Sequence, residues 1–401
     1  MDFQLTAQHQ KIQEVCRRLA ADFATRAAQH DQEVSLPVEN YAALKQEGLY
    51  SLIVPKELGG WGAGVLGWVL AAEELAQGCP TTALTFNMHM AAIGIVMESP
   101  FASPTVKQRV ATLAVQEQKL FAAAVSEPGT SSLVGGTTFM PSVRARRVDG
   151  GYALSGRKAF LSMLEACDYL MYTAQPDNAH NPLAMMIIIG PHPSPGQRVE
   201  QVWDTLGMRG TRSNNLILED CFVSEEGACF TVDNFLEWFL SVTPWAVALG
   251  VVYWGVAAAA YRHACDILKQ RIPRGFAQPL SYHPHIRHRV AEMSVDLEAA
   301  QLLLRHAAWK ADTEGLTSAT QAALLRARYF VGEATARITR SALTACGAHA
   351  LFKTSPLERL FRDGASAPIM PPTSDASLDA IGMFELGLEP TEMLPPLKVA
   401  E

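Results

Sequence analysis

Residues 143–155 read VRARRVDGGYALS, and this stretch decides what kind of fold the chain has. Residues 143–146 alternate between apolar and charged side chains, which is typical of a half-buried strand. Asp149 and the two glycines after it give a hairpin signal, and residues 152–155 return as a second strand. The hairpin therefore places a β-structure near the middle of the chain.

More strands follow this hairpin. Residues 169–174, 183–189 and 215–223 form short apolar runs, separated by Gly, Pro and Asn turns. No helical pattern lies between these runs. Because successive strands without intervening helices usually pair with one another, the sequence predicts a compact antiparallel β-domain.

Helical patterns lie on both sides of this β-domain. Thr6 can cap a helix in which Ile12 and Phe23 recur at helical spacing, and helical patterning resumes over residues 66–115. It returns near Asp233 and continues almost to the end. The fold class is therefore mainly α with a small internal β-domain. The predicted parts are an N-terminal helical domain (1–120), a middle β-domain (121–232) and a C-terminal helical bundle (233–401).

Composition excludes several classes of protein. A chain of 401 residues is too long for one simple core, and its net charge of -7 is spread without basic clusters, so no nucleic-acid partner is expected. The seven cysteines are scattered, with no Cys-x-x-Cys pair, which favours buried thiols in a reducing compartment over disulfides or a metal site. The N-terminus has no signal-peptide pattern. We expect a cytoplasmic protein without a bound metal.

One segment has the length of a membrane span. Residues 244–261 are almost wholly apolar, but they contain many Ala and Gly and are followed at once by polar helical sequence. A fully buried helix of a soluble bundle has the same pattern. With no second span and no basic flank, we interpret the segment as a buried helix.

Residues 125–132 read VSEPGTSS. This stretch resembles the T-E-P-x-x-G-S-D loop of the acyl-CoA dehydrogenase family, and the further motifs given below extend the resemblance over nearly the whole chain. Such a loop offers backbone N–H groups and small hydroxyls to a polar ring edge or a pyrophosphate. The resemblance implies that Val125 and Ser126 meet the flavin ring and that Ser132 meets the pyrophosphate of FAD.

A second motif, residues 154–162, reads LSGRKAFLS and resembles L-x-G-x-K-x-W-I-T. Phe160 stands for the family's Trp and Ser162 for its Thr. Two residues that are two apart on a strand share one face, so one could pack on a ring system while the other hydrogen-bonds to it. Both residues are therefore candidate flavin contacts.

Two further motifs point to structure and to a subunit contact. Residues 206–213, LGMRGTRS, are similar to L-G-x-R-x-S/T, and we expect Arg209 to make a structural ion pair. In the family an Arg before a Phe-Gly pair reaches the FAD of a neighbouring subunit. Two arginines precede Phe276 here: Arg271 is the first choice for this role and Arg274 the second. An arginine suits the role because its guanidinium stays charged and can bind two phosphate oxygens at once.

The most specific motif is PLERLFRD at residues 356–363, close to the family's P-x-E-R-x-x-R-D. In the family a catalytic Glu follows this run and removes the α-proton of an acyl thioester, while the β-hydrogen leaves as hydride to the flavin. Here the Y-E-G-T pattern falls on MPPT, so Pro371 replaces the Glu while Thr373 remains a candidate flavin contact. The other position known for the base corresponds to Trp245. Asp375 is the candidate for a relocated base.

The resemblance implies an FAD-dependent oxidoreductase that acts on an acyl thioester, carried by CoA or by an acyl-carrier protein. The expected reaction is α,β-dehydrogenation with a non-standard or relocated base. A flavin-dependent monooxygenase or oxidase and a catalytically silent FAD-binding partner subunit remain alternatives. The family pattern also implies a homodimer or homotetramer, or a hetero-oligomer with a homologue.

Four histidines need a separate interpretation. His89 lies on a helix expected to border the pocket and could act as acid or base, but a satisfied core histidine is the more frequent case. His283, His285 and His288 cluster at a helix start. No carboxylate or cysteine completes a metal set there, so we expect them at the surface or an interface.

Overall fold

In the computed structural model, residues 4–129, 141–177, 181, 183–225, 229–234, 238 and 250–388 are described. The first helix begins where the sequence predicts, because the Thr6 side chain accepts a hydrogen bond from the backbone N–H of His9 and caps it. The helices before the sheet are α1 (Ala7–Ala24), α2 (Ala27–Glu33), α3 (Val38–Gln46), α4 (Gly64–Gly78), α5 (Pro80–Glu98) and α6 (Pro104–Val115).

The predicted hairpin forms the centre of one sheet, in which the strand order is β6-β7-β3-β2-β4-β5-β8 and β1 pairs with β4. Each predicted strand is present, with its ends shifted by a few residues. Strands β1, β6 and β8 have four residues each, too few to show an alternating pattern. The strands are β1 (Phe121–Ala124), β2 (Arg144–Val148), β3 (Gly151–Leu161), β4 (Tyr169–Pro176), β5 (Met185–Pro191), β6 (Gln197–Glu200), β7 (Asn214–Ser224) and β8 (Cys229–Val232).

The prediction of a purely antiparallel domain was wrong in one respect. Strand β4 runs parallel to both β1 and β2, whereas the other pairs are antiparallel. Only a short hairpin forces two strands to run in opposite directions. The segments that lead to β4 are not hairpins, so its direction relative to those two strands was not fixed by local sequence.

The chain after residue 250 is helical again. Helix α9 takes up the apolar segment, and its residues 250–260 are buried inside the protein, which confirms the buried-helix interpretation for the described part. No helix in the described ranges is long and apolar enough to cross a membrane. The helices are α9 (Gly250–Gln270), α10 (Pro284–Glu314), α11 (Ser318–Cys346), α12 (Pro356–Ala365) and α13 (Ser374–Leu386).

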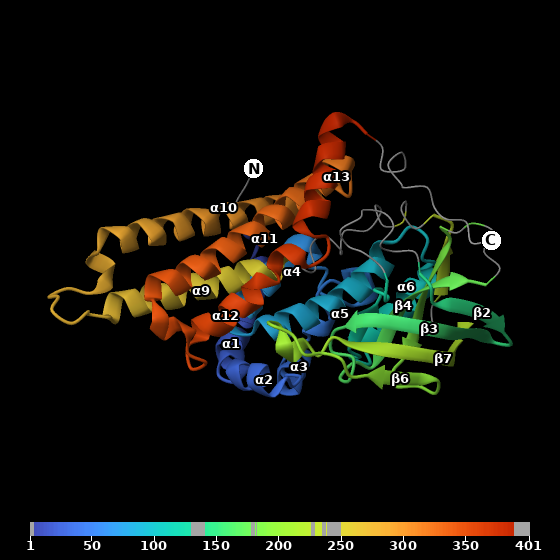
Figure 1. Ribbon diagram of the computed structural model, residues 1–401. Coiled ribbons are helices and arrows are strands. Elements are labelled where there is room, and N and C mark those ends of the chain that lie inside the picture. Colours follow the sequence, from blue (N-terminus) through green and yellow to red (C-terminus); the bar gives the residue numbers. More distant parts are fainter. Residues whose placement is uncertain are drawn as a thin grey trace.

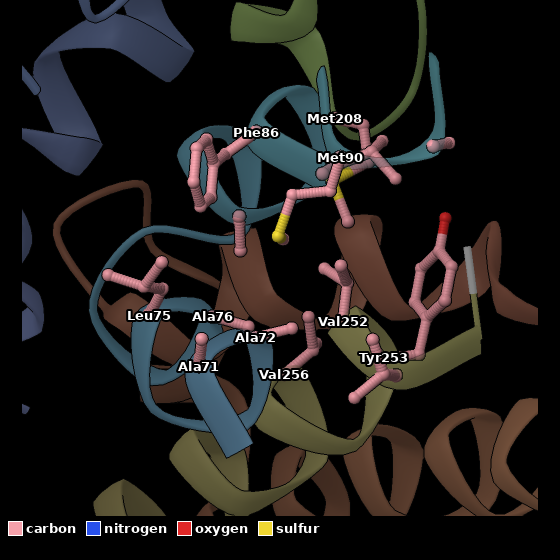
Figure 2. Packing of buried hydrophobic residues seen from close by; sticks show 14 of the residues in the cluster. Ala71, Ala72, Leu75, Ala76, Phe86, Met90, Met208, Val252, Tyr253 and Val256 are labelled. Carbon is pink, nitrogen blue, oxygen red and sulfur yellow. The ribbon is translucent and has the colours of Figure 1, made fainter. Parts of the chain in front are cut away.

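Small residues let the central helices approach closely. A side chain at Gly255 on α9 would meet the Cβ of Ala76 on α4 at 2.5 Å, so only glycine fits this crossing. Figure 2 shows that α4, α5 and α9 meet there, and that Met208 reaches the same cluster from the β-domain side. Helix α5 lies between the C-terminal bundle and the sheet in Figure 1. The two kinds of structure therefore share one core.

Candidate flavin site

The loop after β1 is held against strand β3. The backbone carbonyl of Ser126 accepts a hydrogen bond from the backbone N–H of Ala159 at 2.9 Å. This bond places Val125 and Ser126 beside the residues that precede Phe160. Two motifs that are 29 residues apart in the sequence, at 125 and at 154, thus form one local structure.

A buried ion pair fixes this arrangement. The Lys158 ammonium lies 2.5 Å from a carboxylate oxygen of Glu127, and both side chains are almost fully buried. Lys158 also donates to the Thr173 hydroxyl at 2.9 Å, and Glu127 accepts from the Ser142 backbone N–H at 2.5 Å. Burial lowers the pKa of Lys158 to about 8, against the opposing effect of Glu127. Sequence analysis missed this pair, because each residue is an ordinary charged residue until the fold brings the two together.

Phe160 is an exposed aromatic residue on a distorted strand. Its ring is 66% exposed, and its backbone φ is 60°, in the left-handed region that few residues other than glycine adopt. The pairing of β3 with β7 shifts register between Lys158 and Leu161, and the ring packs edge-on against Trp203 with 6.3 Å between centroids. Such irregularities are found where a strand re-aims a side chain. The ring is presented as an apolar platform.

Ser162 is buried in a chain of hydroxyl groups. Its Oγ lies 2.9 Å from that of Ser213, which lies 2.8 Å from the Thr211 hydroxyl. Thr211 in turn donates to the backbone carbonyl of Met208. This series of hydrogen bonds links the LSGRKAFLS motif (154–162) to the LGMRGTRS motif (206–213).

The expectation that Phe160 and Ser162 share one strand face is wrong. Strand β3 ends at Leu161, and the positive φ at Phe160 breaks the regular alternation on which the expectation rested. Phe160 is exposed, whereas Ser162 is buried and bonded to Ser213. The two residues remain candidate flavin contacts, but not through strand geometry.

The candidate subunit contact lies at the other end of the helical body. Arg271 directly follows α9, and its guanidinium donates to the Cys346 carbonyl at 2.7 Å, next to Gly347. Phe276 is 64% exposed in the turn after Arg271, and Arg274 is also exposed. The structure thus joins Arg271 to the glycine turn at Gly347 and leaves the Phe276 side chain exposed.

The segment in which the sequence motifs predict the family's base leads into α13. Pro371 is half-buried, and Thr373 is buried and caps α13 by accepting from the Ala376 backbone N–H. Asp375 lies in the first turn of α13 and is exposed. A carboxylate that sequence analysis missed, Glu333 on α11, accepts a hydrogen bond from Ser374 at 2.6 Å.

Arg328 holds the start of the same segment. It is fully buried on α11 and donates to the carbonyls of Ala367, at 2.8 Å, and Met370. Burial lowers its pKa to about 10. Its role could not be read from the sequence, because an arginine within an amphipathic helix is normally solvated.

The motifs LGMRGTRS (206–213) and PLERLFRD (356–363) meet at one joint between the domains. Arg362 of α12 pairs with buried Asp31 of α2 at 2.5 Å and donates to the Leu206 carbonyl at 3.0 Å. Asp363 accepts from the Met208 backbone N–H at 2.6 Å, and a side chain at Gly207 would lie 2.2 Å from the Arg362 carbonyl oxygen. These contacts join the N-terminal helices, the β-domain and the C-terminal bundle.

The interpretation of Arg209 as a structural residue is confirmed. Its guanidinium lies 3.2 Å from the carboxylate of Asp204 and donates to the backbone carbonyls of Asp31 and Thr205. These partners are all protein groups of the same joint.

His89 is a satisfied core histidine, as expected. Its ring is fully buried, Nδ1 accepts from the Phe121 backbone N–H at 3.0 Å, and Nε2 lies 2.9 Å from the Tyr50 carbonyl. Since Nδ1 accepts, the neutral ring donates through Nε2. Burial lowers the pKa of His89 to about 4.

The buried His89 should make the free energy of unfolding decrease at acidic pH. Its folded pKa lies below the ordinary value of 6.5, so the unfolded chain binds the proton first as pH falls, and stability is lost between about pH 6.5 and 4. The shift corresponds to about 3 kcal/mol in the free energy of unfolding. Urea unfolding at several pH values should show a shallower acid limb for His89→Gln than for wild type. The exposed-site control His288→Gln should keep the wild-type slope, and equal slopes in all three would contradict the assignment.

Other predicted residues fall elsewhere. Ser132 and Trp245 lie outside the described residues. His283, His285 and His288 are exposed, and no group of His, Cys, Asp and Glu in the described parts could hold a metal ion. The seven cysteines, all within the described ranges, are free thiols.

The chain is ordered as helices, a β-domain and helices, and the exposed ring of Phe160 lies at the end of β3, an interior strand of the sheet. Family models for the N-terminal, middle and C-terminal domains of acyl-CoA dehydrogenase match residues 6–117, 122–221 and 242–385. The chain belongs to the acyl-CoA dehydrogenase family and is an acyl-CoA dehydrogenase-like flavin oxidoreductase. This membership supports FAD as the cofactor.

Individual relatives agree with the family. The chain is 29% identical to a putative acyl-CoA dehydrogenase, YdbM, of Bacillus subtilis, over 92% of this chain and 95% of the relative. It is 28% identical to 3-sulfinopropanoyl-CoA desulfinase of Paraburkholderia xenovorans, over 90% and 91%. The solved structure of butyryl-CoA dehydrogenase from Megasphaera elsdenii superposes with a TM-score of 0.87, at 22% identity, over 96% of this chain and 100% of the other.

Proposed function

We propose that this protein is an FAD-dependent oxidoreductase that performs α,β-dehydrogenation of an acyl thioester, with a base that does not lie at position 371. The observation that carries the proposal is the joining of the 125–127 loop to the strand before Phe160, which makes one surface from two flavin motifs. Family membership supports the same substrate class.

The residues present fit a flavin. The exposed Phe160 ring offers an apolar face, and Val125 and Ser126 lie beside that strand. Ser162 and Thr373 complete the candidate ring contacts, while Ser132 and Arg271 remain candidates for the pyrophosphate. When bound, FAD would supply the hydride acceptor for the β-hydrogen. The protein's own residues would orient the substrate and remove the α-proton.

Removal of Phe160 is expected to weaken flavin binding. Phe160→Ala deletes an exposed ring that would pack on the cofactor, and we expect at least a tenfold rise in the dissociation constant for FAD. Fluorescence titration of apoprotein with FAD measures it. Phe222→Ala is a matched control, because Phe222 is a similarly exposed phenylalanine of the same sheet. Unchanged FAD affinity in Phe160→Ala would contradict the proposed ring contact.

Asp375 is the proposed base. It is a carboxylate in the first turn of α13, four residues after Pro371, and it is exposed and so accessible to a substrate. A base is required because the α-proton of a thioester is only weakly acidic. Ser374, its neighbour in sequence, is bonded to Glu333, and that bond fixes the helix start from which Asp375 projects.

Substitution tests this role directly. Asp375→Asn keeps the shape of the side chain but removes the base, and we expect kcat to fall by about 10²–10⁴-fold with FAD content unchanged. Asp379→Asn, the same change one turn further along α13, should keep wild-type turnover. Full activity in Asp375→Asn would remove Asp375 from the mechanism, and equal losses in both variants would show a structural effect.

A flavin-dependent monooxygenase or oxidase is the second candidate. The feature that favours it is Pro371, which cannot accept a proton and stands where the sequence motifs predict the family's Glu. An oxygen-dependent reaction needs no α-base. Two solved structures of similar fold, at 21% identity and TM-scores of 0.83 and 0.81, are the complex of TdsC with FMN and indole and the FAD complex of PigA.

Anaerobic mixing of the holoprotein with a panel of acyl thioesters separates the candidates. Loss of the visible flavin absorbance would support dehydrogenation, with CoA and carrier-protein thioesters as separate arms. Reduction only by an external reductant, followed by an oxygen-dependent product, would support a monooxygenase. A protein that binds FAD but does neither would be a silent partner subunit. Failure to take up FAD would overturn the proposal as a whole.

The family pattern supports a homodimer or homotetramer, or a hetero-oligomer with a homologue. Exposed Phe276 and the exposed side chains of Leu351 and Phe352 near the glycine turn are consistent with a subunit contact at this end.

A further inference from the structure

A cavity lies beside the joint between the domains, among the helices of the N-terminal and C-terminal parts. It has a volume of about 280 Å³, opens to solvent, and is lined by the end of α1, by α2, the end of α4, the middle of α9, and the start of α12 with residues 353–355 before it. None of its lining residues belongs to the 125–127 loop, to β3 or to α13. The proposed function assigns no role to it.

The lining of this cavity is rich in cationic side chains. Arg262, Lys353 and Arg359 line it, together with His263. The two carboxylates in the lining, those of Asp31 and Glu358, are already occupied. Arg362 pairs with both, and Lys353 also pairs with Glu358. No carboxylate of the lining forms an ion pair with Arg262 or Arg359; outside the lining, the charge of Arg359 acts on the buried carboxyl of Asp363.

Both arginines have N–H groups that form no hydrogen bond with the described residues. One Arg262 nitrogen donates to the side-chain oxygen of Gln77 at 2.9 Å, which orients the guanidinium. Its other N–H groups form no hydrogen bond with the described residues. The Nε of half-buried Arg359 is shielded from solvent and has no hydrogen-bond partner among the described residues. Because this Nε is closed to solvent, a ligand in the cavity would accept hydrogen bonds from the terminal N–H groups of Arg359 and from those of exposed Arg262.

The pKa of His263 responds to the same positive charges. Burial lowers its pKa, and the positive charges of Arg262 and Arg359 lower it further, against the opposing effect of Asp266. Both guanidiniums therefore lie close enough to His263 to act on its charge. The side chains converge on one space from two helices, α9 and α12.

We propose that this cavity binds the phosphate or diphosphate group of a small molecule, held by the guanidiniums of Arg262 and Arg359. Guanidinium groups match the geometry of phosphate oxygens and stay charged at all relevant pH values. The volume exceeds that of several water molecules and so admits a diphosphate. The inference does not depend on the proposed function, because it uses none of the candidate flavin or substrate residues.

Isothermal titration of the holoprotein with inorganic pyrophosphate at constant ionic strength tests the proposal. We expect saturable binding that is at least tenfold weaker in the double variant Arg262→Gln/Arg359→Gln. A charge-matched control, Arg109→Gln/Arg198→Gln, removes two exposed arginines elsewhere and should bind like wild type. Citrate is the comparison ligand and should bind more weakly than pyrophosphate.

Three results would overturn the proposal. Pyrophosphate that fails to bind at millimolar concentration shows that the cavity takes no such anion. Equal weakening in both double variants shows a general charge effect, and equal affinity for citrate removes the preference for phosphate. If the pocket variant does not fold, Arg359→Lys serves instead, because it keeps the charge and loses only the fork. Unchanged affinity in that variant also contradicts the assignment.

Discussion

Replacement of Lys158 by methionine is expected to lower the free energy of unfolding by about 3–5 kcal/mol, the cost of leaving one partner of a buried ion pair without the other. Lys158 and Glu127 are both almost fully buried, so the substitution leaves the Glu127 carboxyl group without its ion-pair partner in a site closed to water. Urea unfolding followed by circular dichroism measures the change. Because the pair ties the 125–127 loop to β3, FAD binding should fall in the same variant.

The neighbouring residue gives a matched control. Arg157 is next to Lys158 on β3 but points outward and pairs with partly exposed Glu200. Arg157→Met should cost less than about 1 kcal/mol, as exposed ion pairs do. The double variant Glu127→Gln/Lys158→Met should recover much of the loss, since no uncompensated charge remains. Equal destabilisation by Lys158→Met and Arg157→Met would show that burial of the pair is not the cause.

Arg362→Met should also cost about 3–5 kcal/mol. Arg362 is nearly buried and pairs with Asp31 and Glu358, so its loss leaves two carboxylates at a shielded joint. The change also removes the hydrogen bond to the Leu206 carbonyl. Thermal and urea unfolding measure the effect. We expect limited proteolysis of the folded variant to be faster, because this joint connects all three domains.

The control for this second substitution is Arg337→Met. Arg337 makes two hydrogen bonds to Asp296, but the pair is half-exposed, so we expect a loss of less than about 1 kcal/mol. A loss in Arg362→Met no larger than in Arg337→Met would mean that the joint is held by apolar packing and not by the ion pairs.

Local patterns identified the fold and most of the elements. The alternation in residues 143–146 and the hairpin glycines predicted β2 and β3, and the cap at Thr6 predicted the start of α1. These features depend on residues within one turn or one hairpin, so they are visible in the sequence. The parallel pairing of β4 is not, because it depends on where distant segments meet.

The candidate site was predicted only in part. The motifs identified Phe160 and Ser162, but the irregularity of β3 that exposes one and buries the other was not visible. A register shift depends on the partner strand and not on the sequence of β3 alone. Glu333 and Arg328, which hold the segment around Pro371, lie on a helix about 40 residues earlier and gave no local signal.

The order of helical, β and helical parts follows from local patterns, and residue identity alone puts Pro371 where the resemblance predicts the family's Glu. Which charges are buried and paired depends on how distant segments meet in the folded chain. Lys158 with Glu127, and Arg362 with Asp31, are ordinary surface-type residues in the sequence. Their energies depend on the loss of water around them, and only the folded chain removes that water.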